Sequence, residues 1–397
     1  MAQQGSVAMA SKVMVAMSGG VDSSVAAALL AEAGHEVIGV TMKLWGGASD
    51  TGCCSVSDVD DARRVCDHLG IEHHVFNFGE EFNEKVVAPY VADHKAGFTP
   101  NPCVECNRHI KFDRLLKRAD ALGFDAVATG HHARIVRVAG GLRSAVGLRS
   151  AEGTAGSVPR LARGVDATKD QSYVLWMLSE PQLERLLLPV GEMNKQQVRE
   201  VAERLGIRTA QKPDSQDVCF ITKSQGRRRF LESHMEATPG QVVTKDGTEV
   251  GSVPGVEFVT IGQRRWLGLE GGGEPMFALD VDIAEAKVVV GSHNDRLVEA
   301  QPITAVEWVG EPVDEPVDEL IERLLSVQCR AHGQVSEGRV VCDEVGNNYI
   351  FWNEPQPRVA PGQSIVFYEG DIVVGGATAS QSKKQTAGNI AAIGVAQ

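Results

Sequence analysis

Short apolar runs alternate with amphipathic stretches through the first half of the chain. The apolar runs predict β-strands over residues 13–17, 35–45, 71–78 and 124–130. The amphipathic stretches predict helices over residues 24–34, 58–70, 80–96, 107–122, 170–188 and 193–205. Strands that alternate with helices pair in parallel through right-handed crossovers. We therefore expect a doubly wound, Rossmann-like α/β sheet.

After residue 225 the pattern changes to short β-like runs between glycine and proline turns. The predicted segments are a flexible extension (1–12), an α/β catalytic domain (13–225), a small β-rich domain (226–298), a β-barrel (299–380) and a disordered tail (381–397). No apolar run reaches the ~18–20 residues of a membrane span, and no export signal is visible. We therefore expect a cytoplasmic protein without a membrane partner.

The segment SGGVDSS, residues 18–24, joins the first predicted strand to the first helix. Its glycines let the backbone approach a phosphate, and the amides of a helix N-terminus face an anion. The serine hydroxyls add donors, and Asp22 is placed to hold Mg²⁺ against phosphates. The loop lacks the Walker lysine that reaches the terminal phosphates of ATP. The alternative reading is a plain turn of small residues.

Residues that end parallel strands should converge on this loop, because ligands of such sheets bind at the carboxyl ends of the strands. Met42 and residues 129–131 stand at such ends. Elsewhere, the close spacing of Cys103 and Cys106 suggests metal-binding or catalytic thiols, since eight cysteines in 397 residues are too few for a secreted disulfide scaffold.

Four segments taken together, SGGVDSS, TPNPCVECNRHIKF, KDQSYVLW and KPDSQDVCFI, resemble the tRNA-specific 2-thiouridylases, a family of PP-loop ATP pyrophosphatases. The resemblance covers nearly the whole chain, and GCCS at residues 52–55 is similar to the actinobacterial-type branch. It implies ATP-dependent replacement of the C2 oxygen of the wobble uridine by sulfur, through adenylated uridine and a cysteine persulfide. The implied ligands and partners are ATP, Mg²⁺, the tRNA anticodon loop and a persulfide donor protein, and we expect a monomer.

The resemblance also implies residue roles. Cys219 would carry the persulfide, and Cys106 would attack the sulfur bridge and leave a Cys106–Cys219 disulfide. The residues implied to contact ATP are Ala16, Met17, Ser18, Gly19, Gly20, Val21, Asp22, Ser23, Ser24, Met42 and Gly130. The residues implied to contact tRNA are His131, Lys169, Asp170, Gln171, Arg330, Ala331 and Gln363.

Charge is consistent with a localised RNA surface. The net charge of −13 argues against indiscriminate nucleic-acid binding. Residues 134–169, however, hold seven Lys/Arg and two Asp/Glu, which predicts an RNA-facing strip. A second basic run, Arg108 to Arg118, recurs at helical spacing and is typical of a solvated helix face.

Alternatives remain at the thiols. Cys103 stands where many family members have aspartate, which weakens an acid–base role there. Cys103, Cys106 and Cys219 could instead hold a 4Fe–4S cluster with one open iron site, whereas Cys53 and Cys54 are expected to be incidental. Two other functions stay open: a PP-loop ligase or amidotransferase that needs no cysteine, and a non-catalytic Fe–S or cysteine–metal RNA-binding protein.

Overall fold

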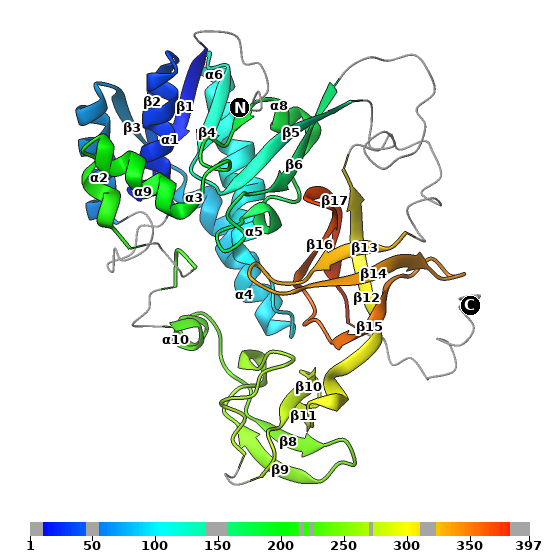
Figure 1. Ribbon diagram of the computed structural model, residues 1–397. Coiled ribbons are helices and arrows are strands. Elements are labelled where there is room, and N and C mark those ends of the chain that lie inside the picture. Colours follow the sequence, from blue (N-terminus) through cyan, green and yellow to red (C-terminus); the bar gives the residue numbers. More distant parts are fainter. Residues whose placement is uncertain are drawn as a thin grey trace.

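The structure, a computed structural model, describes residues 11–44, 55–139, 157–213, 218–221, 226–269, 273–309 and 323–381. Cys53, Cys54, most of the predicted extension and nearly all of the predicted tail lie outside the described residues. Within the described part, the strands form a parallel sheet, a small four-stranded sheet and a barrel (Figure 1).

The parallel sheet confirms the predicted Rossmann-like fold. Its order is β3-β2-β1-β4-β7, and every pairing is parallel. The strands are β1 (Lys12–Ala16), β2 (Glu36–Lys43), β3 (Glu72–Asn77), β4 (Ala126–Thr129) and β7 (Leu186–Leu187). The strand order reverses direction at β1, because β2 follows on one side of β1 and β4 on the other. Doubly wound sheets bind ligands at such a reversal, at the carboxyl ends of the strands.

Helices cover both faces of this sheet. Alternate side chains of β1 divide between two cores: Val13 and Val15 pack with the helices of one face, and Met14 packs on the other. The first face carries α1 (Val21–Glu32), α2 (Val56–Leu69) and α9 (Lys195–Arg204). The second carries two helical runs, α3–η1–α4 (Gly79–Phe82, Asn83–Val87, Ala88–Lys95) and α5–η2–α6 (Pro102–Glu105, Cys106–Arg114, Leu115–Ala121).

The single helix predicted over residues 170–188 is wrong. The chain instead forms a 3₁₀ turn, η3 (Ser172–Val174), the short helix α8 (Glu180–Glu184) and the edge strand β7. Pro181 lies in the first turn of α8, where it has no N–H to continue a preceding helix. Ser179 caps α8 through a reciprocal pairing with Gln182, so the helix begins there.

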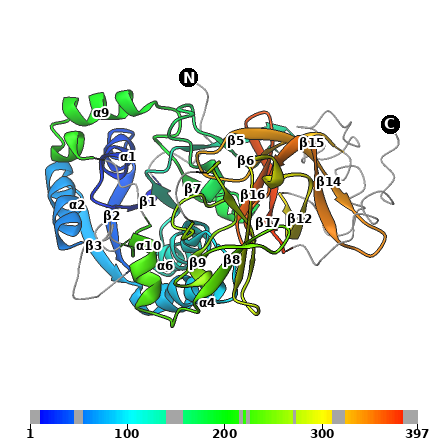
Figure 2. The ribbon, with the colours of Figure 1, turned by 90° about the horizontal axis from the view of Figure 1, so that it is seen from below.

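The predicted β-barrel is confirmed. Six antiparallel strands close on themselves: β12 (Leu297–Trp308), β13 (Leu325–Gln328), β14 (Val335–Cys342), β15 (Asn348–Pro357), β16 (Ser364–Glu369) and β17 (Ile372–Ala379). The hairpin of β5 (Ala133–Ala139) and β6 (Ser157–Arg163), which sequence reasoning missed, extends the barrel sheet from the α/β domain through β17. Figure 2 shows the parallel sheet and the barrel toward opposite ends of the molecule.

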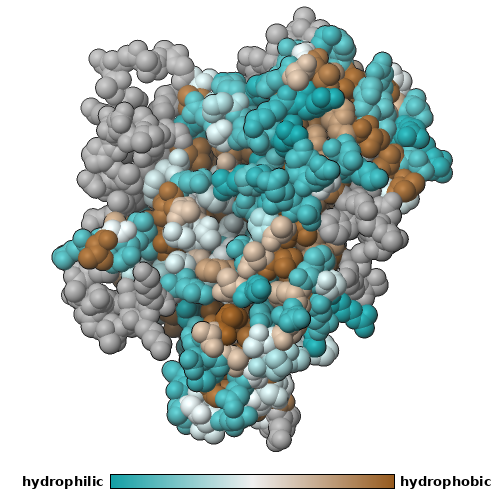
Figure 3. All heavy atoms as spheres, turned by 180° about the vertical axis from the view of Figure 1, so that it is seen from behind, coloured by the Kyte–Doolittle hydropathy of each residue, from teal (hydrophilic) through white to brown (hydrophobic). Residues whose placement is uncertain are grey.

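A smaller sheet lies between residues 240 and 291. It contains β8 (Gly240–Thr244), β9 (Glu249–Val253), β10 (Phe277–Asp282) and β11 (Lys287–Gly291), in the order β10-β11-β8-β9, and follows the short helix α10 (Gly226–Glu232). On the molecular face in Figure 3, apolar side chains form separated patches among hydrophilic ones. Among the described residues, no helix combines the length and apolar character that crossing a membrane requires.

Candidate active site

The glycine loop follows β1 and opens helix α1 at Val21, as predicted. Gly19 has φ +70°, and a Cβ there would stand 2.4 Å from the carbonyl oxygen of Asp58 in the first turn of α2. Only glycine fits this position, because both the backbone conformation and the space exclude a side chain. The loop therefore leaves the amides at the start of α1 available to an anion.

The end of β4 packs directly on this loop. A Cβ at Gly130 would lie 2.5 Å from the backbone nitrogen of Ser23, so Gly130 allows the closest approach of the two segments. The hydroxyls of Ser23 and Ser24 donate to the Gly20 carbonyl at 3.2 and 2.8 Å, while Ser18 is exposed. Met42 is buried in the apolar core. The expected convergence of β1 and β4 is thus present, and the contact of Met42 with ATP stays a prediction.

Asp22 is held by two cationic or proton-donating side chains that sequence reasoning did not assign. Lys195 Nζ lies 2.8 Å from each carboxylate oxygen, and His132 Nε2 lies 3.0 Å from Oδ1. Burial raises the pKa of Asp22, but the hydrogen bonds from His132 and Lys195 outweigh it and lower the pKa below its usual value. Asp22 is therefore ionised at neutral pH.

A second lysine reaches the loop from the segment that leads to Cys219. Lys212 Nζ donates to the Gly19 carbonyl at 3.0 Å and to Asp58 and Asp61 at 2.8 and 2.7 Å. Burial lowers the pKa of Lys212, but the bonds to Asp58 and Asp61 outweigh it and raise the pKa. Lys195 and Lys212 thus bring two positive charges to a loop that has no lysine of its own, through partners distant in sequence.

The two thiols predicted to react lie on one apolar cluster. Cys106 begins η2 and is buried within the cluster, and the half-buried Cys219 packs against it. The neighbouring ring of Phe220 packs at 5.7 Å from Phe82, 5.5 Å from Tyr90 and 5.1 Å from Phe230, measured between ring centroids. These aromatic contacts hold the Cys219 segment against helices α3, α4 and α10.

Cys103 occupies a different environment. It lies in the four-residue helix α5, is exposed, and its backbone N–H donates to the Asn101 side chain at 3.1 Å. Burial raises the pKa of Tyr90 to about 12, with a smaller contribution in the same direction from Cys103, which therefore lies near that ring. Among the described residues, no group of three or more Cys, His, Asp or Glu side chains is arranged to hold a metal ion. Cys103, Cys106 and Cys219 do not fit a cluster site in this structure.

The residues predicted to contact tRNA near β4 form a connected network. The Nδ1 atom of His131 forms a hydrogen bond of 2.7 Å with the Thr129 hydroxyl. Burial lowers the pKa of His131 well below its usual value, and the nearby charges of Lys111 and His132 lower it further. Gln171 exchanges two hydrogen bonds of 2.9 Å with the backbone of His132. The segment 169–171 is therefore tied to the same histidine that holds Asp22.

Asp170 is buried, and its carboxylate fixes the backbone of this segment. Its carboxylate accepts from the backbone of Gly164 and Ser172, from the Ser172 hydroxyl and from Arg163. Lys169, which precedes it, is half-buried. Asp170 thus positions the segment 169–171, in which the side chains of Lys169 and Gln171 are partly exposed to solvent.

The structure describes only part of the predicted RNA-facing strip over residues 134–169, because Arg143 and Arg149 lie outside the described residues. Each of its four described arginines pairs with a carboxylate: Arg134 with Asp371, Arg137 with Glu184, Arg160 with Glu180 and Arg163 with Asp170. These pairs join the β5–β6 hairpin to neighbouring segments, because all four carboxylates lie outside the hairpin. The Arg160 side chain is buried in its contact, with 1% of its surface exposed. The pairs of Arg134 and Arg137 are partly exposed, and the RNA-facing strip stays a prediction.

The predicted contacts from the barrel lie beside the Cys103 loop. The Gln363 side chain donates to the carbonyl of Thr99. Arg330 is exposed, and Ala331 packs against the cluster that contains Cys106. The structure therefore brings Ala331 to the cluster that contains the two thiols and Gln363 to the segment that leads to Cys103.

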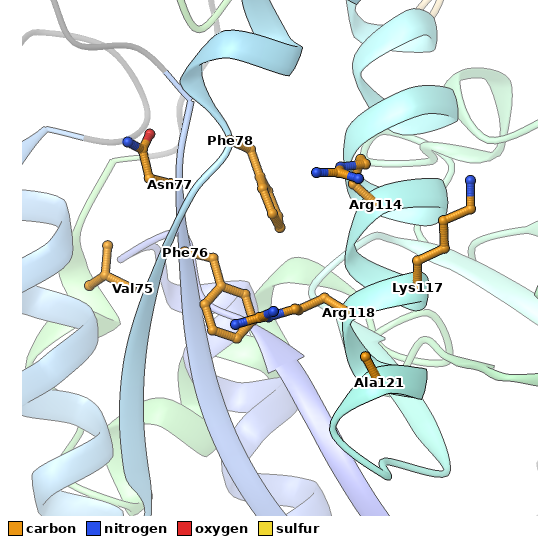
Figure 4. Close-up of a pocket in the computed structure, with 8 residues that line it drawn as sticks. All are labelled: Val75, Phe76, Asn77, Phe78, Arg114, Lys117, Arg118 and Ala121. Carbon is orange, nitrogen blue, oxygen red and sulfur yellow. The ribbon is translucent and has the colours of Figure 1, made fainter.

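A groove of about 500 Å³ lies apart from these residues, between the edge strand β3 and helix α6 (Figure 4). Arg118 lies 5.3 Å from the ring of Phe76 and Arg114 lies 6.0 Å from the ring of Phe78. Arg114 also pairs with Glu81, and Lys117 pairs with Asp113 at 2.7 Å. The part of the basic run that borders this groove, from Arg114 at the end of η2 to Arg118 in α6, is thus exposed and has local partners.

Family models match nearly the whole described chain. Residues 11–223 match the tRNA methyl transferase HUP domain, 228–292 the tRNA methyl transferase PRC-barrel domain and 302–379 the aminomethyltransferase beta-barrel domain. A crystal structure of a 4-thiouridine synthetase–RNA complex with bound ATP is 18% identical and covers 53% of this chain and 45% of its own, with a TM-score of 0.32. That likeness is too low to carry an argument.

Curated relatives are much more similar. The tRNA-specific 2-thiouridylase MnmA of Roseiflexus sp. (strain RS-1) is 45% identical over 379 residues, covering 92% of this chain and 98% of the relative. The protein of the same name from Acidothermus cellulolyticus is 41% identical over 388 residues, covering 95% and 100%. With identity of this level over almost the full length of both chains, the protein belongs to the tRNA-specific 2-thiouridylase family.

Proposed function

We propose that this chain uses ATP to replace the C2 oxygen of a uridine in tRNA by sulfur. The family relationship supports the reaction class. The observation that carries the proposal is the packing of Cys106 and Cys219 on one apolar cluster, although they belong to segments far apart in the sequence. A nucleotide loop alone fits many reactions, whereas this loop in one chain with two thiols that pack on one apolar cluster supports sulfur transfer.

The first half of the reaction is activation of the uridine. The loop over residues 18–24, closed by Gly130, holds the phosphates of ATP at the N-terminus of α1. The uridine oxygen attacks the α-phosphorus and pyrophosphate leaves, so that the oxygen can later depart as AMP. Mg²⁺ accompanies the phosphates as part of the substrate, and the ionised Asp22 offers the oxygen ligand that Mg²⁺ prefers.

The second half is delivery of sulfur. A donor protein loads Cys219 with a persulfide, and the terminal sulfur of that persulfide attacks C2 as AMP leaves. Cys106 then attacks the Cys219 sulfur of the bridge, which releases 2-thiouridine and leaves a Cys106–Cys219 disulfide for reduction. A disulfide requires close approach of the two thiols, so this order of events requires Cys106 and Cys219 to meet.

The tRNA would be held by residues around this cluster. We propose the wobble uridine of the anticodon loop as the target, since a base in a single-stranded loop leaves the stack at the lowest cost. The proposed contacts are His131, Lys169, Gln171, Arg330, Ala331 and Gln363, with Asp170 in a positioning role. We further infer that the protein is a cytoplasmic monomer. Light scattering should therefore give the molar mass of a single chain.

The test is Cys219→Ser, with Cys342→Ser as the matched control because Cys342 is an exposed cysteine at the end of β14. We expect no 2-thiouridine in tRNA from cells that carry only Cys219→Ser, and a normal amount with the control, by nucleoside mass spectrometry. A normal amount of 2-thiouridine in cells that carry only Cys219→Ser would overturn sulfur transfer through this thiol and favour a ligase or amidotransferase that needs no cysteine. Absence of pyrophosphate release from ATP and unmodified tRNA by the parent protein would favour a non-catalytic RNA-binding protein.

A further inference from the structure

Trp266 combines two unfavourable features in the small β-rich domain. Its side chain is 82% exposed, although large aromatic side chains are normally well buried. Its backbone has φ +66°, a left-handed conformation that a bulky residue rarely adopts. Such an outlier persists only where the surrounding structure fixes it, and it points to a functional constraint.

The residues on both sides of Trp266 fix its orientation. Leu267 is buried in the core of the small domain. Gly268 has φ +64°, and a Cβ there would stand 1.8 Å from the carbonyl oxygen of Ser252. On the other side, the Gln263 side chain donates to the Arg265 carbonyl at 2.8 Å. The backbone is thus anchored before and after Trp266, and the indole is held outward.

Arginines lie on and near the loop that carries Trp266. Arg264 and Arg265 precede it in sequence and are exposed. A guanidinium nitrogen of Arg330 lies 4.0 Å from where a Cβ at Gly262 would stand. Burial and the nearby charge of Arg330 lower the pKa of Arg296, so these two guanidinium groups also lie close together. In the part of the chain that the structure describes, none of these four arginines forms an ion pair with a carboxylate.

The Trp266 loop borders the candidate active site. At its start, the Thr260 hydroxyl lies 3.4 Å from the Thr99 hydroxyl and accepts a hydrogen bond from Arg227 at 3.0 Å. Thr99 begins the segment that leads to Cys103 and Cys106, and its carbonyl accepts from Gln363. A ligand that reaches Arg330 and Gln363 would therefore pass this loop.

We propose that Trp266 stacks on an unpaired base of the tRNA other than the reacting uridine, with Arg264, Arg265 and Arg330 on the adjoining phosphates. The proposal rests on the proposed function. A flat aromatic surface flanked by cations is what single-stranded RNA requires, because every base has a face that stacks and every nucleotide carries a phosphate. A protein or membrane contact fits less well, since Trp266 is the only large apolar side chain classed as exposed between residues 226 and 296 of the described chain.

The test is Trp266→Gly, for which stacking predicts opposite effects on binding and folding. Glycine adopts φ +66° without strain, so the thermal unfolding midpoint should stay unchanged or rise. The dissociation constant for unmodified tRNA should increase about 5- to 100-fold, the range expected for loss of one base–aromatic stack. Trp266→Phe should retain most of the affinity. Val345→Ala, which also removes an 82% exposed apolar side chain but in the barrel, is the matched control and should bind like the parent.

Fluorescence gives a second readout. Bound tRNA should shield the exposed indole from iodide quenching in the parent protein, and this protection should disappear in Trp266→Phe. Equal affinity of the parent and Trp266→Gly, or quenching unaffected by bound tRNA, would overturn the stacking proposal while leaving the proposed function intact. Failure of the parent protein itself to bind tRNA would overturn the proposed function.

Discussion

The ammonium nitrogen of Lys195 lies 2.8 Å from both carboxylate oxygens of Asp22, although 173 positions separate the two residues. Asp22 stands in the first turn of α1, and Lys195 begins α9. Their contact ties the nucleotide loop to a helix late in the α/β domain. With Lys212 on the Gly19 carbonyl, it places two positive charges around a loop that has no lysine of its own.

We predict that Lys195→Met slows pyrophosphate release by about 100-fold, the scale of losing one preorganised electrostatic donor at a reacting group. The change removes the cation beside the phosphate loop and leaves Asp22 with His132 alone. Lys195→Arg should recover part of the rate, because the charge is kept while its position changes. Release of pyrophosphate from ATP with unmodified tRNA measures the effect.

The control for this prediction is Lys12→Met. Lys12 forms an exposed pair with Glu36 at 3.3 Å, at the opposite end of β1 from the loop. Exposed pairs contribute little to stability, so the control should keep the parent rate. A parent-like rate in Lys195→Met would show that its charge does not act on the phosphates.

Sequence reasoning succeeded where local pattern and covalent order decide the outcome. The apolar run of β1 and the glycines of residues 18–24 are local, and a parallel sheet then brings Gly130 to the loop. Lys195 and Lys212 could not be found in this way, because each acts through a partner distant in sequence. The carboxylate partners of the arginines in residues 134–169 could not be found either, because partners such as Asp371 are distant in sequence.

Cys106→Ser should stop the reaction after sulfur transfer. If Cys106 resolves the bridge, the variant still releases pyrophosphate in a single turnover but keeps tRNA attached to Cys219 through a disulfide. We expect a protein–tRNA adduct on a denaturing gel that an added thiol removes, with release of 2-thiouridine. Free 2-thiouridine formed by Cys106→Ser without added thiol would contradict this role.

Cys103 distinguishes the persulfide route from a cluster route. Its exposed position, and the absence of a three-ligand group among the described residues, lead us to expect that Cys103→Ser keeps most of its thiolation activity. Anaerobically purified protein should also contain iron well below one cluster per chain, by elemental analysis. Iron near four atoms per chain, lost together with activity in Cys103→Ser, would establish the cluster route instead.

Protonation of His94 should destabilise the contact between the α/β domain and the small β-rich domain. Burial lowers the pKa of His94 to about 4, the charge of Arg227 adds to this, and a hydrogen bond with the Glu257 backbone opposes it. The unfolded chain binds the proton near its ordinary pKa of about 6.5. Between these values the unfolded state holds a proton that the folded state lacks, so stability is full above about pH 6.5 and is lost as the pH falls toward 4.

Chemical denaturation at pH 7.5 and 4.5 measures this loss, which we expect to be about 2–3 kcal/mol from His94 alone. His94→Phe keeps an aromatic ring at the position that packs edge-on at 4.6 Å from Tyr90, but it cannot take up a proton. The difference in unfolding free energy between the two pH values should therefore be smaller in His94→Phe than in the parent. His74→Gln, which changes an exposed histidine beside Glu72, should keep the parent difference. Equal pH dependence in the parent and His94→Phe would mean that the loss of stability arises from other groups, because carboxylates such as Asp22 act in the same direction.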